Sequence, residues 1–239
     1  MGESAMSEKI IVALDYPHVD KAKVLLEQLK GIPCYMKVGM ELFYAAGPSF
    51  VEQLKKDGYR VFLDLKLHDI PNTVKGAARS IASLGVDILN VHAAGGVKMM
   101  EAAMEGVQEG ANAAFPLPKV IAVTQLTSTT QQMMNDEIGI QGAVEENVLH
   151  YAKLAQEAGL HGVVASPLEV KKIKERCGEH FVTVTPGIRA HDAPLQDQSR
   201  TMTPAEAFQQ GTDFIVMGRY ITQAKDPRKT LEDIIEGLG

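Results

Sequence analysis

The chain has 239 residues, of which 45% are hydrophobic, and its formal net charge is −6. This length supplies one large hydrophobic core, and the acidic balance without a basic block argues against nucleic acid and membrane surfaces as partners. Cys34 and Cys177 are the only cysteines, too few for a disulfide framework or a zinc site, so we expect a reducing cytoplasm. No run is long and apolar enough to span a bilayer.

The chain opens on residues 1–8, which lack the apolar region of a signal peptide, and we expect a disordered leader there. Eight short apolar runs follow, each typical of a parallel strand that is buried on both faces. In chain order they are KIIVALD (9–15), CYMKVGM (34–40), RVFLDLK (60–66), VDILNVH (86–92), KVIAVTQL (119–126), HGVVAS (161–166), FVTVTPG (181–187) and DFIVMGR (213–219).

The segments between these runs carry apolar residues at helical spacing. In 20–30, Ala22, Leu25 and Leu29 lie on one face, and 71–85 repeats the pattern between a proline and a glycine that suit the two ends of a helix. Comparable stripes lie in 48–57, 97–109, 143–158, 167–176, 204–210 and 227–236.

Eight strands that alternate with helices, in roughly the 250 residues typical of the fold, predict a single (β/α)₈ TIM barrel. This catalytic domain spans 9–239. The alternative is a doubly wound open sheet, which usually has fewer strands, and its G-x-G-x-x-G fingerprint is missing after the first run. Two long polar connections, 127–142 and 188–203, have the character of binding loops or lids.

Charged residues gather where the first three strands end, which is the face that carries the active site in this fold. Asp15 ends the first run, Lys37 lies near the end of the second, and the third brings Asp64, Lys66 and, just beyond it, Asp69. Five charges on three consecutive strands favour a catalytic cluster. The alternative is a buried lattice of ion pairs that only closes the mouth of the barrel.

The spacing within the third run indicates which way these charges point. Asp64 and Lys66 are two residues apart and therefore share a face of the strand, while Leu65 points toward the helices. The shared face is then the barrel interior, where charges are costly unless they are paired. Asp15 and Lys37 supply the neighbours for an alternating network of acids and bases.

A phosphate site is predicted at the end of the eighth strand, where Gly218 and Arg219 offer backbone N–H groups and a planar charged donor. The segment TPGIR (185–189) could form a second wall. The alternative is that Arg219 is an ordinary surface residue. No spacing of histidine, aspartate and glutamate forms a strong metal site.

These motifs together resemble one family. DLKLHDIPNT (64–73) is similar to the D-x-K-x-x-D signature of orotidine 5′-phosphate decarboxylases. The resemblance extends from about residue 9 to the C-terminus, and the absence of an extra domain fits the monofunctional microbial form. Further matching segments are VALD (12–15), MKVG (36–39), VTQLTS (123–128), VTPGIR (184–189) and VMGRYI (216–221).

The resemblance implies that orotidine 5′-monophosphate loses CO₂ to give UMP, without a metal or an organic cofactor. It also implies a homodimer whose active sites lie at the interface. Lys66 would protonate C6 of the pyrimidine, and Asp64 would lie beside the substrate carboxylate. Asp69 would reach into the neighbouring subunit's site together with Ile70 and Thr73.

The same resemblance implies roles for the remaining candidates. Lys37 and Asp15 would contact the ribose and complete the charged network, and Thr127 would meet the pyrimidine. Pro186 would lie against the base. The residues that would hold the phosphate or its closing loop are Arg189, Gln198, Gly218 and Arg219.

Two other functions remain open on the sequence. A metal-dependent sugar-phosphate decarboxylase of the 3-keto-gulonate 6-phosphate type shares the D-x-K-x-x-D signature, but it places glutamate where Lys37 stands and needs a divalent cation. A non-catalytic barrel that binds nucleotide phosphates would be expected to lack Lys66 or Asp69, and both are present.

Overall fold

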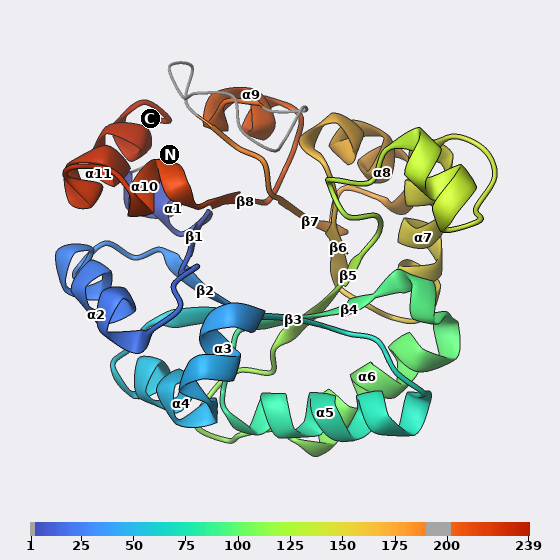
Figure 1. Ribbon diagram of the computed structural model, residues 1–239, viewed down its shortest axis with the longest axis horizontal. Helices are drawn as coiled ribbons and strands as arrows, with labels where there is room; N and C mark the ends of the chain where they lie inside the picture. Colours follow the sequence, from blue (N-terminus) through green and yellow to red (C-terminus); the bar gives the residue numbers. More distant parts are fainter. Residues whose placement is uncertain (1–2, 190–201) are drawn as a thin grey trace.

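The structure is a computed structural model that describes residues 3–189 and 202–239. Eight parallel strands pair in chain order and close into a barrel through β1 and β8 (Figure 1). This confirms the predicted TIM barrel. The strands are β1 (Ile10–Ala13), β2 (Tyr35–Gly39), β3 (Arg60–Leu67), β4 (Ile88–His92), β5 (Lys119–Val123), β6 (Gly162–Val164), β7 (Val182–Thr185) and β8 (Phe214–Met217).

Helices form the outer layer around this barrel (Figure 1). They are α1 (Glu3–Ser7), α2 (Val19–Gln28), α3 (Met40–Ala46), α4 (Pro48–Lys56), α5 (Pro71–Ser83), α6 (Val97–Glu109), α7 (Val144–Glu157), α8 (Val170–Cys177), α9 (Pro204–Gln209), α10 (Arg219–Thr222) and α11 (Pro227–Glu236). The elements η1 (Ala93–Gly95) and η3 (Pro167–Glu169) are short 3₁₀ turns, and η2 (Met133–Glu137) is a single π-helical turn.

The structure differs from the sequence prediction at the N-terminus. Part of the segment predicted to be a disordered leader forms α1, and Met6 and Ser7 are buried because α1 packs against α11. The short helices α3 and α10 were not predicted, since neither is long enough to show a helical stripe. None of the helices in the described part of the chain combines the length and apolar character that a membrane crossing requires.

The core has two layers because successive strand residues point to opposite sides of the barrel wall. Inside the barrel, Ile11, Phe62, Ile88, Ile121 and Val184 form a compact apolar cluster. The intervening residues face outward and join the larger core between the strands and the helices. The interior is therefore filled by side chains, and a ligand can enter only at an end of the barrel.

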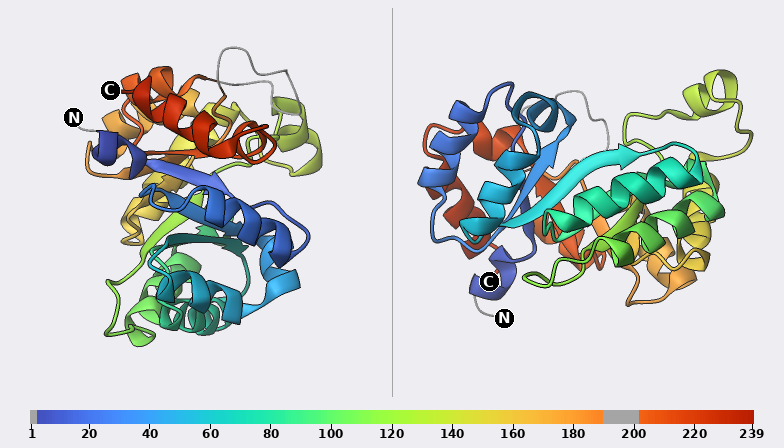
Figure 2. Two further views of the ribbon diagram at one scale, coloured as in Figure 1. Left: turned by 90° about the vertical axis from the view of Figure 1, so that its left-hand side faces the viewer. Right: turned by 90° about the horizontal axis from the view of Figure 1, so that it is seen from below.

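Helices α5 and α6 lie side by side on the outside of β3 and β4 (Figure 2). Their approach depends on Gly106, because an added Cβ there would lie 2.1 Å from the backbone oxygen of Lys75 in α5. Any side chain at Gly106 would therefore push α6 away from α5, the helix that follows β3.

Two ion pairs, each with a buried lysine and a partly exposed aspartate, lie at the end of the barrel at which the strands begin. Lys55 donates to Asp87 at 2.5 Å, and Asp87 also accepts from the N–H of Val61. Lys174 and Asp213 repeat the arrangement four strands later at 2.6 Å. Both pairs lie far from the carboxyl ends of the strands. They therefore stabilise the barrel and take no part in a site at the opposite end.

Candidate active site

A row of charged side chains crosses the mouth of the barrel at the ends of β1, β2 and β3. The Nζ atom of Lys66 lies 2.7 Å from Oδ1 of Asp64, and the Nζ atom of Lys37 lies 3.0 Å from Oδ2 of the same carboxylate. Asp15 stands at the rim, with its Oδ1 4.0 Å from the Nζ atom of Lys37. The structure thus brings four of the predicted site residues together, with Asp64 at the centre.

Asp64 is held ionised by this arrangement. Burial alone would raise the pKa of its carboxyl, but the ammonium groups of Lys37 and Lys66 and the hydrogen bonds from Lys66 and Asn90 lower it below its usual value. Three donors reach the two carboxylate oxygens at 2.7, 2.8 and 3.0 Å. A buried carboxylate with charged and neutral donors on both oxygens keeps its charge and its orientation.

The backbone of β3 departs from a regular strand where Lys66 lies. Leu63 pairs with Leu89 of β4 and Leu67 pairs with Val91, so four steps along β3 match only two along β4. Within this bulge Lys66 has a φ of 52°, the only positive φ of a non-glycine residue in the described ranges. Such conformations cost free energy and are concentrated at functional sites. The alternation of strand residues therefore explains the direction of Asp64, whereas the bulge sets that of Lys66.

Asn90 joins the charged row from β4, and sequence reasoning assigned it no role. Its side chain is 2% exposed, its Oδ1 accepts from the backbone N–H of Lys66 at 2.9 Å, and its Nδ2 donates to Oδ1 of Asp64 at 2.8 Å. The signal in the sequence was a polar residue in an otherwise apolar run, two positions after Ile88 and hence on the inner face.

A cavity of about 240 Å³ opens beside this row. Lys37, Asp64 and Lys66 form one wall, and Phe62 lies among the apolar residues that line it. Two further predicted residues, Thr127 and Pro186, also line the cavity, the first from the segment after β5 and the second from the segment after β7. A flat ring could contact the apolar part of this cavity while its substituents reach the charges.

His92 borders the row as the next inward residue of β4. Burial, followed by the nearby His68 and Lys66, lowers the pKa of its imidazole, and the two histidine rings lie 5.3 Å apart between centroids. His92 is therefore neutral at neutral pH and adds no third cation beside Lys37 and Lys66.

The structure does not bring Asp69, Ile70 and Thr73 to this cluster within the described chain. Asp69 lies past the end of β3, is exposed, and accepts a hydrogen bond from the N–H of Ile70 at 2.7 Å. Ile70 is 66% exposed, and Thr73 is exposed in the first turn of α5. None of these three residues lines the cavity of their own chain.

The predicted phosphate residues surround the end of β8. An added Cβ on Gly218 would lie 3.9 Å from Oδ2 of Asp15, so this glycine borders the charged row, and the exposed Arg219 begins α10 directly after it. The N–H of Arg189 donates to the backbone oxygen of Met202 at 2.9 Å, across the two ends of the long connection. Gln198 lies outside the described residues.

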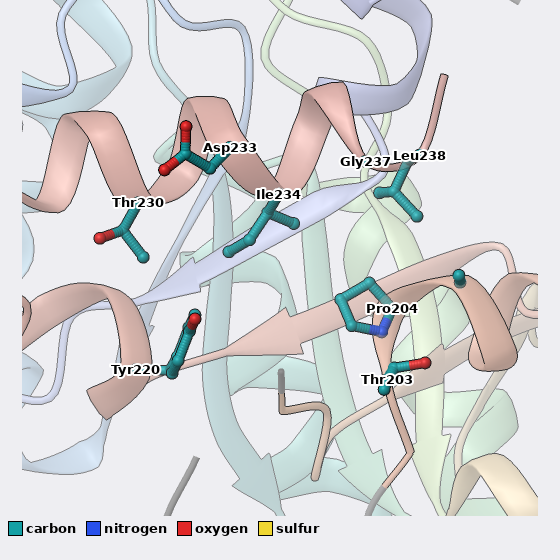
Figure 3. A pocket seen from close by; sticks show the side chains of 9 residues that line it. Thr203, Pro204, Tyr220, Thr230, Asp233, Ile234, Gly237 and Leu238 are labelled. Atoms are coloured by element: carbon teal, nitrogen blue, oxygen red, sulfur yellow. The ribbon is translucent and has the colours of Figure 1, made fainter. Parts of the chain in front are cut away.

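A second cavity, of about 330 Å³, lies between α9, α10 and α11 on the outside of the barrel (Figure 3). Tyr220, Ile234 and Leu238 contribute much of its described lining, and Asp233 is the single charged residue there. Since the side chain of Asp233 is paired with Lys229, this cavity offers no cluster of charges comparable to the row at the barrel mouth.

Comparisons with known proteins agree with this geometry. The model of the orotidine 5′-phosphate decarboxylase / HUMPS family matches residues 8–234. The chain is 53% identical over 229 residues to the orotidine 5′-phosphate decarboxylase of Bacillus cytotoxicus, covering 96% of both proteins. It is also 53% identical over 236 residues to that of Bacillus mycoides, covering 98% of this chain and 99% of the relative.

Solved structures give the same result. Orotidine 5′-phosphate decarboxylase from Lactobacillus acidophilus aligns with a TM-score of 0.88 at 41% identity, covering 97% of this chain and 99% of that one. An uncharacterized conserved protein from Geobacillus kaustophilus aligns with a TM-score of 0.86 at 46% identity, covering 96% of this chain and 100% of that one. The chain belongs to the orotidine 5′-phosphate decarboxylase / HUMPS family.

Proposed function

We propose that this chain decarboxylates orotidine 5′-monophosphate to UMP, the last step of de novo pyrimidine nucleotide synthesis, with Lys66 as the group that protonates C6. The observation that carries the proposal is the row Lys37–Asp64–Lys66, in which two ammonium groups flank one ionised carboxylate beside a cavity. The 53% identity to decarboxylases of this name supports it.

The chemistry explains why such a row is needed. The bond between C6 and the carboxylate carbon breaks, and its electron pair stays on C6 while neutral CO₂ leaves. The resulting carbanion is of the vinyl type and has no π electron sink, so charges placed in advance must stabilise it. The ammonium of Lys66 supplies such a charge and then transfers a proton to C6. Solvent reprotonates the amine for the next turnover.

Asp64 acts on the substrate carboxylate in this proposal. Because its pKa is lowered, Asp64 is negatively charged over the neutral pH range and repels a carboxylate placed beside it. The repulsion ends when the substrate carboxylate becomes neutral CO₂, which favours the transition state over the bound substrate. The donors that hold Asp64 keep it from turning away.

Contacts to the rest of the substrate follow from the positions around the row. Lys37 and Asp15 contact the ribose hydroxyls, since they continue the row from Asp64 toward the rim. Thr127 contacts the polar edge of the pyrimidine, and Pro186 packs against its face, because both line the cavity.

The phosphate binds at the end of β8. Arg219 is exposed directly after the strand, and a guanidinium can donate two parallel hydrogen bonds to a phosphate. Gly218 borders Asp15, which puts this anchor next to the ribose end of the row. Arg189 and Gln198 bind the phosphate or close the connecting segment over it. Since the phosphate is remote from C6, its binding energy can be used to assemble the site around the reacting carbon.

We propose further that two copies of the chain form a homodimer in which Asp69, Ile70 and Thr73 complete the partner's site. Asp69 is exposed past the end of β3 and forms no ion pair with either lysine of its own row, within the residues described. Large apolar side chains are also exposed in the segments that follow β2 and β3: Met40 at 47% and Tyr44 at 73% in α3, and Ile70 at 66%. A partner subunit would bury them.

The reaction proceeds without a metal or an organic cofactor in this proposal, because Lys66 supplies both the stabilising charge and the proton. The ammonium of Lys37, 3.0 Å from Asp64, would also repel a divalent cation at the place where the metal-dependent alternative needs one. Cys34 and Cys177 are free and buried, which suits a reducing cytoplasm.

The direct test follows the ultraviolet absorbance of orotidine 5′-monophosphate mixed with purified protein and EDTA. The absorbance should change with turnover. A protein that is inactive with EDTA and regains activity with a divalent cation would favour the metal-dependent alternative, and one that binds UMP without turnover would favour a binding barrel.

The role of Lys66 is tested by Lys66→Ala, which should bind UMP but lose turnover. Lys75→Ala is the matched control, since Lys75 lies on α5 outside the cavity and pairs with Glu105 and Glu109. Full activity of Lys66→Ala would refute the assignment.

The shared site is tested by mixing Lys66→Ala chains with Asp69→Ala chains. A mixed dimer would then contain one site with both changes and one intact site, so random pairing should restore about a quarter of the wild-type activity. If both residues served the same chain's site, every site would be damaged. No recovery in dimers confirmed as mixed would therefore contradict the shared site.

A further inference from the structure

We infer that Asn90 is the positioning residue of the active site: its amide fixes the Asp64 carboxylate and the strained Lys66 backbone at the same time. The inference rests on the proposed decarboxylation and adds a residue to it. Asn90 is buried, and its two hydrogen bonds, 2.8 and 2.9 Å long, end on the two residues that meet the reacting carbon.

The fold determines where this amide lies. Ile88 belongs to the cluster inside the barrel, so Asn90, two residues later on β4, also points inward. On its other side β4 keeps a regular register with β5, in which Asn90 pairs with Ile121. Asn90 therefore lies on a regularly paired strand, beside the bulge of β3 that contains Lys66.

The orientation of the amide is fixed by its partners. The backbone N–H of Lys66 can only donate and an ionised carboxylate can only accept, so Oδ1 must face Lys66 and Nδ2 must face Asp64. Reversing the amide would lose both bonds. No aliphatic or hydroxyl side chain can serve the two partners from this place, because the task requires an acceptor and a donor a fixed distance apart.

Each of the two bonds has a separate consequence. The first holds the N–H of Lys66 at a φ of 52°, a conformation that a lysine does not keep without support, and so directs the side chain into the mouth. The second contributes to the lowered pKa of Asp64 and leaves its carboxylate no free rotation, because Lys66 and Lys37 hold the two oxygens as well.

The first experiment measures kcat and KM for orotidine 5′-monophosphate in Asn90→Leu, which keeps the branch point at Cγ with somewhat larger end groups and lacks both bonds. We expect kcat to fall about 10- to 100-fold, the range seen when the partners of functional groups are removed, with KM changed much less. Thr183→Val is the control: it removes a buried hydroxyl that bonds Asp213, on the outward face of β7 and near the end at which the strands begin, and it should keep kcat.

The second experiment uses Asn90→Asp and the pH profile of kcat. The introduced carboxyl can still accept from the N–H of Lys66, but when ionised it repels Asp64 across the present 2.8 Å contact. When protonated it regains a donor. The deficit relative to wild type should therefore shrink as the pH is lowered, which a loss of packing alone would not produce.

The results separate the inference from the function on which it rests. If the wild type does not turn over the substrate, the proposed function fails. If the wild type is active and a folded Asn90→Leu or Asn90→Asp variant keeps kcat within about twofold at all pH values, only the inference fails. Should Asn90→Leu not fold, the pH profile of Asn90→Asp decides alone, and a deficit that is constant with pH would overturn the positioning role.

Discussion

The conformation of Lys66 makes a prediction about stability that is independent of catalysis. Lys66 has a φ of 52°, inside the left-handed region that glycine occupies freely and other residues rarely occupy. Replacing Lys66 by alanine or by glycine removes the same ammonium group, so the two variants differ only in what the backbone costs at that φ. We expect Lys66→Gly to be the more stable of the two.

The expected difference follows from two opposing contributions. A left-handed conformation costs an L-residue roughly 1–2 kcal/mol, and Lys66→Gly removes this cost while Lys66→Ala retains it. Glycine loses more conformational freedom on folding, which costs about 0.5–1 kcal/mol relative to alanine in a strand. The glycine variant should therefore be more stable by about 0.5–1 kcal/mol, or about 2 °C in Tm for a chain of this length.

Arg60 provides the matched control, because it begins the same strand, is exposed, and does not have a positive φ. At that position Arg60→Ala should be more stable than Arg60→Gly by about 0.5–1 kcal/mol. Subtracting the two glycine–alanine differences cancels the entropy of glycine and leaves about 1–2 kcal/mol, the cost of the left-handed conformation itself.

The assay is urea unfolding followed by far-ultraviolet circular dichroism, since the chain has no tryptophan. All four variants are compared at one protein concentration, because association would shift the midpoint. The reasoning is refuted if alanine is favoured over glycine at position 66 by the same margin as at position 60, since the backbone at Lys66 would then store no strain.

Three further predictions concern the charged groups. The pKa of Asp64 in the folded protein lies below its ordinary value of 3.8. The ionised carboxylate therefore contributes its full stability above pH 3.8, and this contribution is lost as the pH falls through the lowered pKa. Below pH 3.8 the unfolding free energy of Asp64→Asn should decline less steeply than that of the wild type. Lys174→Met should lower the unfolding free energy by about 1–3 kcal/mol, because Asp213 loses its cation although water reaches part of its side chain, and kcat should not change. Arg219→Ala should raise KM for orotidine 5′-monophosphate at least about tenfold. Turnover of orotidine, which has no phosphate, should be the same in the variant and the wild type, and an equal loss on both substrates would contradict the phosphate role.

The sequence by itself determined the architecture. Eight apolar runs separated by helical stripes are enough to predict a barrel, because strands buried on both faces and helices apolar on one face leave few other ways to pack. The alternation of residues in the third run also predicted that Asp64 points into the barrel. The structure agrees, because Phe62, two residues earlier on the same face of the strand, belongs to the inner cluster. These features are local, so they can be read without knowing which strand pairs with which.

Only the tertiary structure decided how the site is supported. The bulge at Lys66 arises from the pairing of β3 with β4, which are separate in the sequence, and residue alternation within β3 alone contains no sign of it. For the same reason Asn90 could be recognised as inward-facing, but not as the partner of Asp64 and Lys66, until the two strands lay side by side.

The outward position of Asp69 completes this division. The signature D-x-K-x-x-D places three charged residues within six positions, yet the structure puts two of them in one cavity and the third on the surface. Spacing in a strand fixes the direction of a side chain only as long as the strand continues, and Asp69 lies past its end. Local periodicity thus determined the fold and the inward direction of Asp64. Pairing between β3 and β4 determined the backbone conformation of Lys66 and the hydrogen bonds from Asn90.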